Sequence, residues 1–155
     1  MGVYYLDSSA VVKLYIPEAG SGLVTALVTA RSGEVWENRI VFAKIGIVEV
    51  TAAIAKRRRM RDITLEEQKL FVQSFLGDCA RRFALLKADD SIIRSAVDLT
   101  QRHPLRGYDA VHLSTALTLN HSLLSAHLPP LTFVSADQIQ CQAAEAEGLS
   151  ILIPT

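Results

Sequence analysis

The sequence predicts an α/β protein, a three-layer α/β/α sandwich around a central parallel sheet of about five strands. Five short apolar runs alternate with stretches of helical periodicity, a pattern typical of parallel strands joined by right-handed crossovers. The first and fourth runs each lead, through small residues and an aspartate, into a helical stretch. The expected strands are Val3–Leu6, Arg39–Phe42, Phe83–Leu86, Leu131–Val134 and Ser150–Ile153.

Caps and amphipathic stripes place the helices between these strands. Ser8 or Ser9 is the expected N-cap of a short first helix that Pro17 prevents from continuing. Thr64 and Glu67 have the spacing of a capping box at the start of a long helix. We expect helices over 10–15, 19–30, 43–59, 64–81, 89–103, 109–119 and 138–147, and a polar loop over 120–130.

Size and composition favour one domain spanning residues 1–155. A chain of 155 residues with 50% hydrophobic residues can bury a substantial core. No apolar run is long enough to cross a bilayer and no secretion signal begins the chain, so we expect a cytoplasmic protein without a membrane partner. Cys79 and Cys141 lack the spacing of a zinc site or a disulfide framework, which favours buried thiols.

Positive charge is concentrated in one segment although the net charge is zero. The run from Lys56 to Arg61 contains five cations, among them Arg57, Arg58 and Arg59. Cations near a helix C-terminus complement the helix dipole. The same residues could bind RNA phosphates, and the sequence leaves both interpretations open.

Four acids are candidates for one site. Asp7 and Asp137 follow strands, and the carboxyl ends of parallel strands meet at one edge of a sheet. Asp109 begins one helix and Glu49 lies within another, so either can lean over that edge. Two carboxylates about 5 Å apart repel by roughly 3 kcal/mol at an effective dielectric of 20. A divalent cation relieves this repulsion, and all-oxygen ligation favours Mg²⁺ or Mn²⁺.

Each candidate also has a structural interpretation. An aspartate before a helix, such as Asp137, is a common N-cap. His112, three residues after Asp109, could join a metal site, but a structural histidine held by a hydrogen bond is favoured. We expect Tyr5 and Tyr108, like Tyr4, to be core aromatics and not platforms for base stacking.

The acids and their neighbours resemble the four acidic blocks of the PIN-domain family, in particular the ribonuclease toxins of the VapC kind from toxin-antitoxin pairs. The residues that carry this resemblance are Tyr5-Leu6-Asp7-Ser8-Ser9-Ala10, Glu49, Tyr108-Asp109-Ala110-Val111-His112-Leu113 and Phe133-Val134-Ser135-Ala136-Asp137. The resemblance implies five parallel strands, cleavage of RNA dependent on Mg²⁺ or Mn²⁺, a homodimer, and a small antitoxin that inserts into the acidic groove. Carried over by position, Asp7, Glu49, Asp109 and Asp137 are the catalytic, metal-binding acids, with Ser9 and Ser135 as hydrogen-bonding support.

The expected reaction is hydrolysis of an RNA phosphodiester by metal-activated water. No nucleophilic side chain is needed, so Ser8 and Ser9 are interpreted as a cap and a hydrogen-bond donor. Three alternatives remain: a PIN nuclease of RNA maturation without an antitoxin, a catalytically degenerate interaction module, and a receiver-like phosphoacceptor. The presence of all four acids disfavours the second, and the single acid after the first strand disfavours the third.

Overall fold

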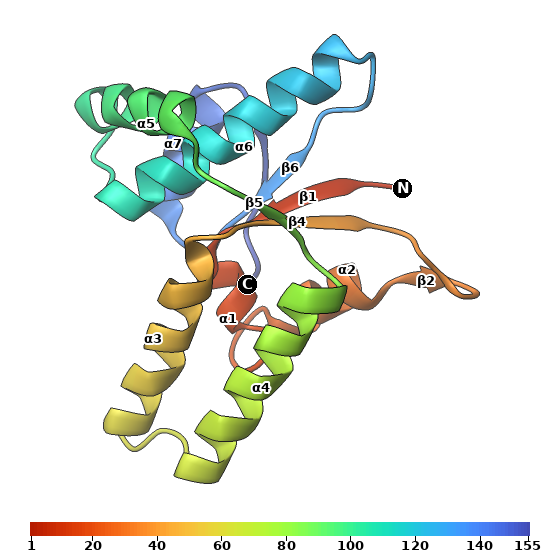
Figure 1. Ribbon diagram of the computed structural model, residues 1–155, viewed down its shortest axis with the longest axis vertical. Helices are drawn as coiled ribbons and strands as arrows, with labels where there is room; N and C mark the ends of the chain where they lie inside the picture. Colours follow the sequence, from red (N-terminus) through yellow and green to blue (C-terminus); the bar gives the residue numbers. More distant parts are fainter.

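The computed structural model describes all residues from Met1 to Thr155 and contains a five-stranded parallel sheet (Figure 1). The strands run in the order β5-β4-β1-β6-β7, so β1 occupies the centre. Tyr5 of β1 pairs with Val41 on one side and with Phe133 on the other. The strands are β1 (Val3–Leu6), β4 (Arg39–Ala43), β5 (Ala84–Leu86), β6 (Thr132–Val134) and β7 (Ser150–Leu152).

Helices cover both faces of this sheet. One core contains Leu6 and Phe42 from the strands and is covered by the first four helices. The other contains Tyr5 and Phe133 and is covered by the last three. Tyr5 and Leu6 are neighbours in β1 and point to opposite faces, as the two-residue period of a strand requires. The helices are α1 (Ser8–Val12), α2 (Ser21–Thr29), α3 (Gly46–Arg59), α4 (Leu65–Arg81), α5 (Asp90–Arg102), α6 (Gly107–Ser125) and α7 (Gln138–Ala146).

The predicted layers and the five strands are confirmed, with strand ends within one residue of expectation. The capping box of Thr64 and Glu67 is also confirmed. The predicted cap of the first helix is wrong: Asp7, and neither Ser8 nor Ser9, is the N-cap of α1, because its carboxylate accepts the Ala10 N–H.

The predicted loop over 120–130 is mostly helix. α6 continues to Ser125 because Leu119 and Leu123, one turn apart, pack against the second core. Asn120 stays on the helix, where its side-chain oxygen accepts a hydrogen bond from the backbone N–H of Leu131 at 3.0 Å. The connection to β6 is therefore a short turn that ends at Pro129 and Pro130.

A small antiparallel hairpin, β2 (Arg31–Ser32) and β3 (Val35–Trp36), was not predicted from the sequence. Its turn contains Gly33 at a φ of +63°, a conformation that glycine adopts without strain. The Trp36 ring packs against the guanidinium groups of Arg31 and Arg82, at 3.6 and 4.2 Å from its centroid. Two-residue strands carry too little periodicity to be recognised.

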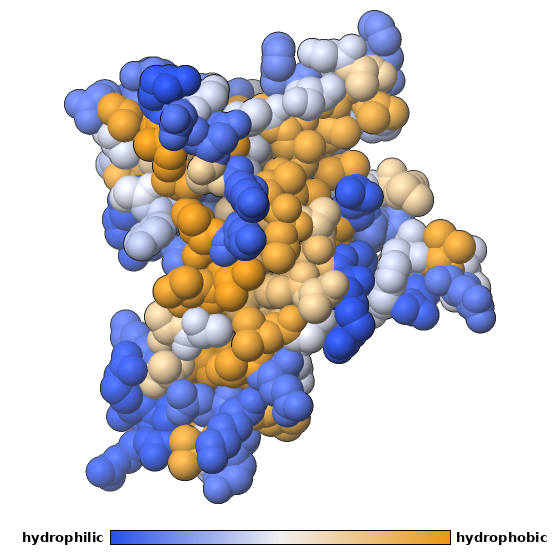
Figure 2. Space-filling model, viewed as in Figure 1, coloured by the Kyte–Doolittle hydropathy of each residue, from blue (hydrophilic) through white to orange (hydrophobic).

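The two cysteines are unpaired and buried, as expected. Burial raises the pKa of both thiols, Cys79 and Cys141, to about 11. No helix combines the length and the apolar character required to cross a membrane. Apolar residues do gather across the middle of the face where β5 runs between α4 and α6, while hydrophilic residues dominate the far ends of α3 and α4 (Figure 2).

Candidate active site at the carboxyl edge of the sheet

Asp7 is a buried carboxylate at the end of the central strand, only 3% exposed. Its Oδ1 accepts hydrogen bonds from the Ala10 N–H at 3.0 Å and from the Ser9 hydroxyl at 2.6 Å. Its Oδ2 accepts one from the Ser135 hydroxyl at 2.6 Å. Burial raises the pKa of Asp7, and the hydrogen bonds from Ser135 and Ser9 oppose that rise. A carboxylate has about four acceptor positions, so these three bonds leave roughly one for a ligand.

Ser9 and Ser135 belong to one hydrogen-bonded junction with Asp7. The Ser9 oxygen accepts the Ala136 N–H at 2.9 Å, and the Ser135 oxygen accepts the Asp137 N–H at 3.0 Å. The junction therefore joins the segment after β1 to the segment after β6. It fixes both hydroxyl groups against Asp7 and leaves neither as a free nucleophile.

Glu49 lies in the first turn of α3, and its side chain is 23% exposed. Its Oε1 contacts Nε2 of His112 at 2.6 Å and accepts a hydrogen bond from the Ser8 hydroxyl at 3.1 Å. The other oxygen, Oε2, makes no hydrogen bond within the protein and can accept one from a ligand. As expected, His112 is a buried histidine held by hydrogen bonds, because its ring is 1% exposed and hydrogen-bonded on both nitrogens.

Asp109 and Asp137 are linked by the guanidinium of Arg106. The Arg106 Nε donates to Asp109 Oδ2 at 2.9 Å, and an Nη2 lies 3.8 Å from Asp137 Oδ2. The hydrogen bond and charge of Asp109 raise the pKa of Arg106, with further contributions from the charges of Asp137 and Glu49. Asp137 is also the N-cap of α7, since its Oδ1 accepts the Gln140 N–H at 3.1 Å.

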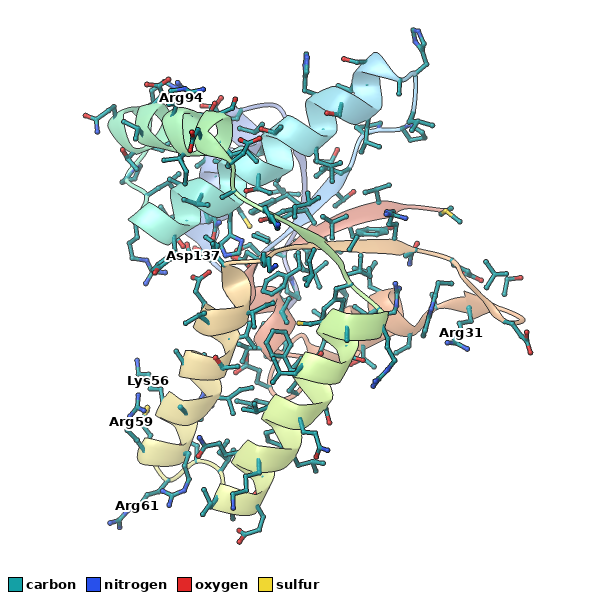
Figure 3. All side chains as sticks on the ribbon, viewed as in Figure 1. Arg31, Lys56, Arg59, Arg61, Arg94 and Asp137 are labelled. Carbon is teal, nitrogen blue, oxygen red and sulfur yellow. The ribbon has the colours of Figure 1, made fainter.

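All four predicted acids therefore lie at the same edge of the sheet. Asp7 reaches Asp137 through Ser135, Asp137 reaches Asp109 through Arg106, and Glu49 reaches the start of α1 through Ser8. In Figure 3, Asp137 is seen close to the upper end of α3, where that helix approaches the sheet. Gln140 adds a further link, from its amide nitrogen to the Asp109 carbonyl at 3.2 Å.

The donor set suits a hard divalent cation. No group of three or more His, Cys, Asp or Glu side chains is placed to hold a metal ion by itself. Mg²⁺, however, commonly binds through only one or two carboxylates and retains several waters. The exposed Arg106 guanidinium places positive charge between Asp109 and Asp137 and offsets part of their mutual repulsion. The residues that could hold an ion are the four acids.

A pocket of about 580 Å³ opens beside two of the acids. Its wall includes Glu49, Arg106 and Asp109, together with apolar side chains of α5 such as Ile93 and Val97. The prediction that Tyr108 is a core aromatic is wrong, because it is 60% exposed and lines this pocket. It lies in the first turn of α6, before Ala110, the first buried residue of that helix. Tyr4 is half-buried and Tyr5 fully buried, as expected.

The basic run lies at the opposite end of α3 from Glu49. Arg57 lies eight positions after Glu49, which is about 12 Å along a helix. Arg57 forms ion pairs with Glu18 and Asp62, Arg58 is half-buried, and Arg59 is exposed. Lys56, Arg59 and Arg61 project outward there, away from Asp137 (Figure 3). Binding of RNA by Arg57, Arg58 and Arg59 stays a prediction.

Two contacts in the site were not predicted from the sequence. The contact of His112 with Glu49 joins residues 63 positions apart and depends on how α3 and α6 meet. The role of Arg106 was not predicted. Its position three residues before Asp109 is the available signal, because residues three apart at a helix start can exchange hydrogen bonds.

Comparisons with known proteins identify the family of this chain. The family model described as the PIN domain matches residues 4–127. Ribonuclease VapC45 and ribonuclease VapC49, from two strains of Mycobacterium tuberculosis, are each 31% identical over 121 residues, which is 77% of this chain and 78% of theirs. The crystal structure of FitAcB from Neisseria gonorrhoeae has a TM-score of 0.65 at 16% identity, with 97% of both chains covered. VapBC2 from Rickettsia felis, bound to a DNA fragment from its promoter, has a TM-score of 0.61 at 14% identity, with 97% of this chain and 98% of that chain covered. The chain therefore belongs to the PIN domain family, and within it to the VapC kind.

Proposed function

We propose that this protein is an endoribonuclease that hydrolyses RNA phosphodiesters at the acidic edge of its sheet, using Mg²⁺ or Mn²⁺, and that it is the toxin of a toxin-antitoxin pair acting in the cytoplasm. The observation that carries the proposal is the convergence of Asp7, Glu49, Asp109 and Asp137 at one edge, with a free oxygen on Glu49. The ribonuclease names of the two relatives support the choice of RNA.

Some of these side chains would bind the metal ion, and others would orient a carboxylate or the substrate. Asp7 and Asp109 would hold the principal ion, and Glu49 and Asp137 would bind it directly or through water. A bound divalent cation supplies positive charge at the phosphate and lowers the pKa of water. Ser9 and Ser135 fix the orientation of the Asp7 carboxylate. Arg106 would contact a phosphate, since its side chain is 81% exposed beside the acids.

The test is cleavage of structured RNA by the purified protein with Mg²⁺, with Mn²⁺ and with EDTA. We expect metal-dependent cleavage that disappears in Asp7→Asn and in Asp109→Asn. Asp98→Asn is the matched control, because Asp98 is exposed on α5 and forms no ion pair. Cleavage that survives both site variants would refute the proposed site. Cleavage in EDTA would refute the proposed dependence on a metal ion.

An antitoxin and a second copy of the chain are the proposed protein partners. The support for the antitoxin is the naming of the relatives as VapC and of the structural neighbours as VapBC. The apolar side chains across the middle of the face in Figure 2 provide surface for such contacts. A PIN nuclease of RNA maturation would act without an antitoxin, so the absence of a small antitoxin-like reading frame beside this gene would favour that alternative.

A further inference from the structure

A buried chain of hydrogen bonds runs from the second core to the acidic edge. The Tyr5 hydroxyl lies 2.9 Å from Nδ1 of His112, and Nε2 of His112 lies 2.6 Å from Oε1 of Glu49. Tyr5 is fully buried and His112 is 1% exposed. These hydrogen bonds therefore connect a fully buried residue of β1 to one oxygen of a partly exposed acid.

The donors and acceptors in this chain have one consistent arrangement for a neutral imidazole. A carboxylate only accepts, so Nε2 must carry the proton that is shared with Glu49. Nδ1 is then an acceptor, and the phenol of Tyr5 is the donor that satisfies it. The Tyr5 hydroxyl thus selects the tautomer in which His112 can hold Glu49.

Packing holds the imidazole in this orientation. The Phe42 ring lies 6.1 Å from the His112 ring, centroid to centroid, at an interplanar angle of 29°. The Tyr5 ring meets it edge-on at 6.0 Å. The Ser8 hydroxyl donates to the same Oε1 of Glu49 at 3.1 Å. Both donors therefore occupy Oε1, and Oε2 is left without a hydrogen bond from the protein.

We propose that His112 is a positioning residue: with Tyr5 and Ser8 it anchors Oε1 of Glu49, so that Oε2 is presented to a divalent cation at the acidic edge. This inference rests on the proposed function. His112 touches neither the ion nor the substrate in this arrangement and acts only through Glu49. Partners of metal ligands at this distance commonly change metal affinity or activity by about 10- to 100-fold when they are replaced.

Two substitutions separate this role from a purely structural one. In His112→Gln the amide nitrogen can occupy the position of Nε2 and donate to Glu49, whereas the shorter side chain of His112→Asn reaches only the position of Nδ1. Both remove a buried ring, so both should lower the melting temperature. We expect the Gln variant to keep its Mn²⁺ affinity within about 3-fold of wild type, and the Asn variant to lose about 10- to 100-fold.

The measurements are Mn²⁺ binding by calorimetry or electron paramagnetic resonance, at a temperature where each variant is folded, together with melting curves. Equal Mn²⁺ affinity in the Asn and Gln variants would overturn the proposal, because a structural histidine affects stability and not the ion. ¹⁵N NMR of the wild-type ring needs no variant: a proton on Nε2 is expected, and its absence would also overturn the proposal.

These outcomes are distinguishable from failure of the proposed function. If the wild type binds Mn²⁺, the two variants split as expected and no RNA is cut, the positioning role stands and the nuclease proposal fails. If RNA is cut but the variants bind Mn²⁺ alike, the nuclease proposal stands and the positioning role fails. A wild-type protein that binds no Mn²⁺ refutes both.

Discussion

Arg106 occupies the position at which a cation would neutralise Asp109 and Asp137, so it should compete with a metal ion. Its Nε donates to Asp109 Oδ2 at 2.9 Å, and its side chain is 81% exposed. An ion that binds Asp109 must weaken this pair. Replacing Arg106 with glutamine should therefore increase the affinity for Mn²⁺.

The expected gain is small because the pair is exposed. Solvent-exposed ion pairs contribute about 0.2–1 kcal/mol, which corresponds to roughly 1.4- to 5-fold in a binding constant. The 3.8 Å approach to Asp137 adds little, since it exceeds hydrogen-bonding distance. Salt should reduce the gain, because the Debye length falls from about 10 Å at 0.1 M to about 3 Å at 1 M.

Mn²⁺ titration of wild type and Arg106→Gln at 0.05 M and 1 M KCl measures the effect. Arg94→Gln is the matched control, because Arg94 projects from α5 into solvent without an ion pair. Equal or weaker Mn²⁺ binding by Arg106→Gln at low salt would refute the competition. A similar gain in the Arg94 variant would assign the effect to net charge alone.

Two stability predictions follow from contacts away from the site. His103 and Arg102 hydrogen-bond to Glu147 and hold the pKa of its carboxyl below the ordinary value. These contacts therefore stabilise the fold fully when the pH is above the ordinary pKa, and the stabilisation is lost as the pH falls through the lowered pKa. Glu147→Gln should therefore lower the unfolding free energy by up to about 1 kcal/mol at pH 7, and its stability should converge with that of wild type in acid. Urea titrations across pH measure this, with the exposed Glu145→Gln as the control. A difference from wild type that stays constant at all pH values would contradict the prediction. Gly20 has a φ of +84°, and a Cβ there would meet the Pro154 carbonyl, so Gly20→Ala should cost about 1–3 kcal/mol. The helical Gly22 has open space around it, so Gly22→Ala should stabilise by about 0.5–1 kcal/mol; melting curves that moved in the same direction for both would refute the distinction.

The elements that could be predicted are those whose signal is local. Apolar runs revealed the five strands, and Thr64 with Glu67 revealed the start of α4, because each depends on residues a few positions apart. The loop prediction over 120–130 failed because its polar residues were given more weight than the stripe formed by Leu119 and Leu123. Polar residues in a helix need only face solvent, as Ser122 does.

The four acids of the candidate site could be predicted from the sequence, but the side chains that hydrogen-bond to them could not. The rule that parallel strands end at one edge places Asp7 and Asp137 together. Which side chain satisfies each oxygen depends on tertiary distances, as in the contact of His112 with Glu49. The exposure of Tyr108 likewise depends on tertiary packing, which leaves the start of α6 uncovered.

Two of the acids have a structural role that decides how the site should be tested. Asp7 caps α1 and Asp137 caps α7, each through an oxygen that accepts a backbone N–H. Replacing such a cap with alanine costs about 1 kcal/mol whether or not the acid binds an ion. Asparagine retains an oxygen for the N–H and removes the charge. Loss of cleavage in Asp7→Asn or Asp137→Asn with an unchanged melting temperature would therefore report the chemistry of the carboxylate, whereas the same loss in the alanine variants could arise from a frayed helix start.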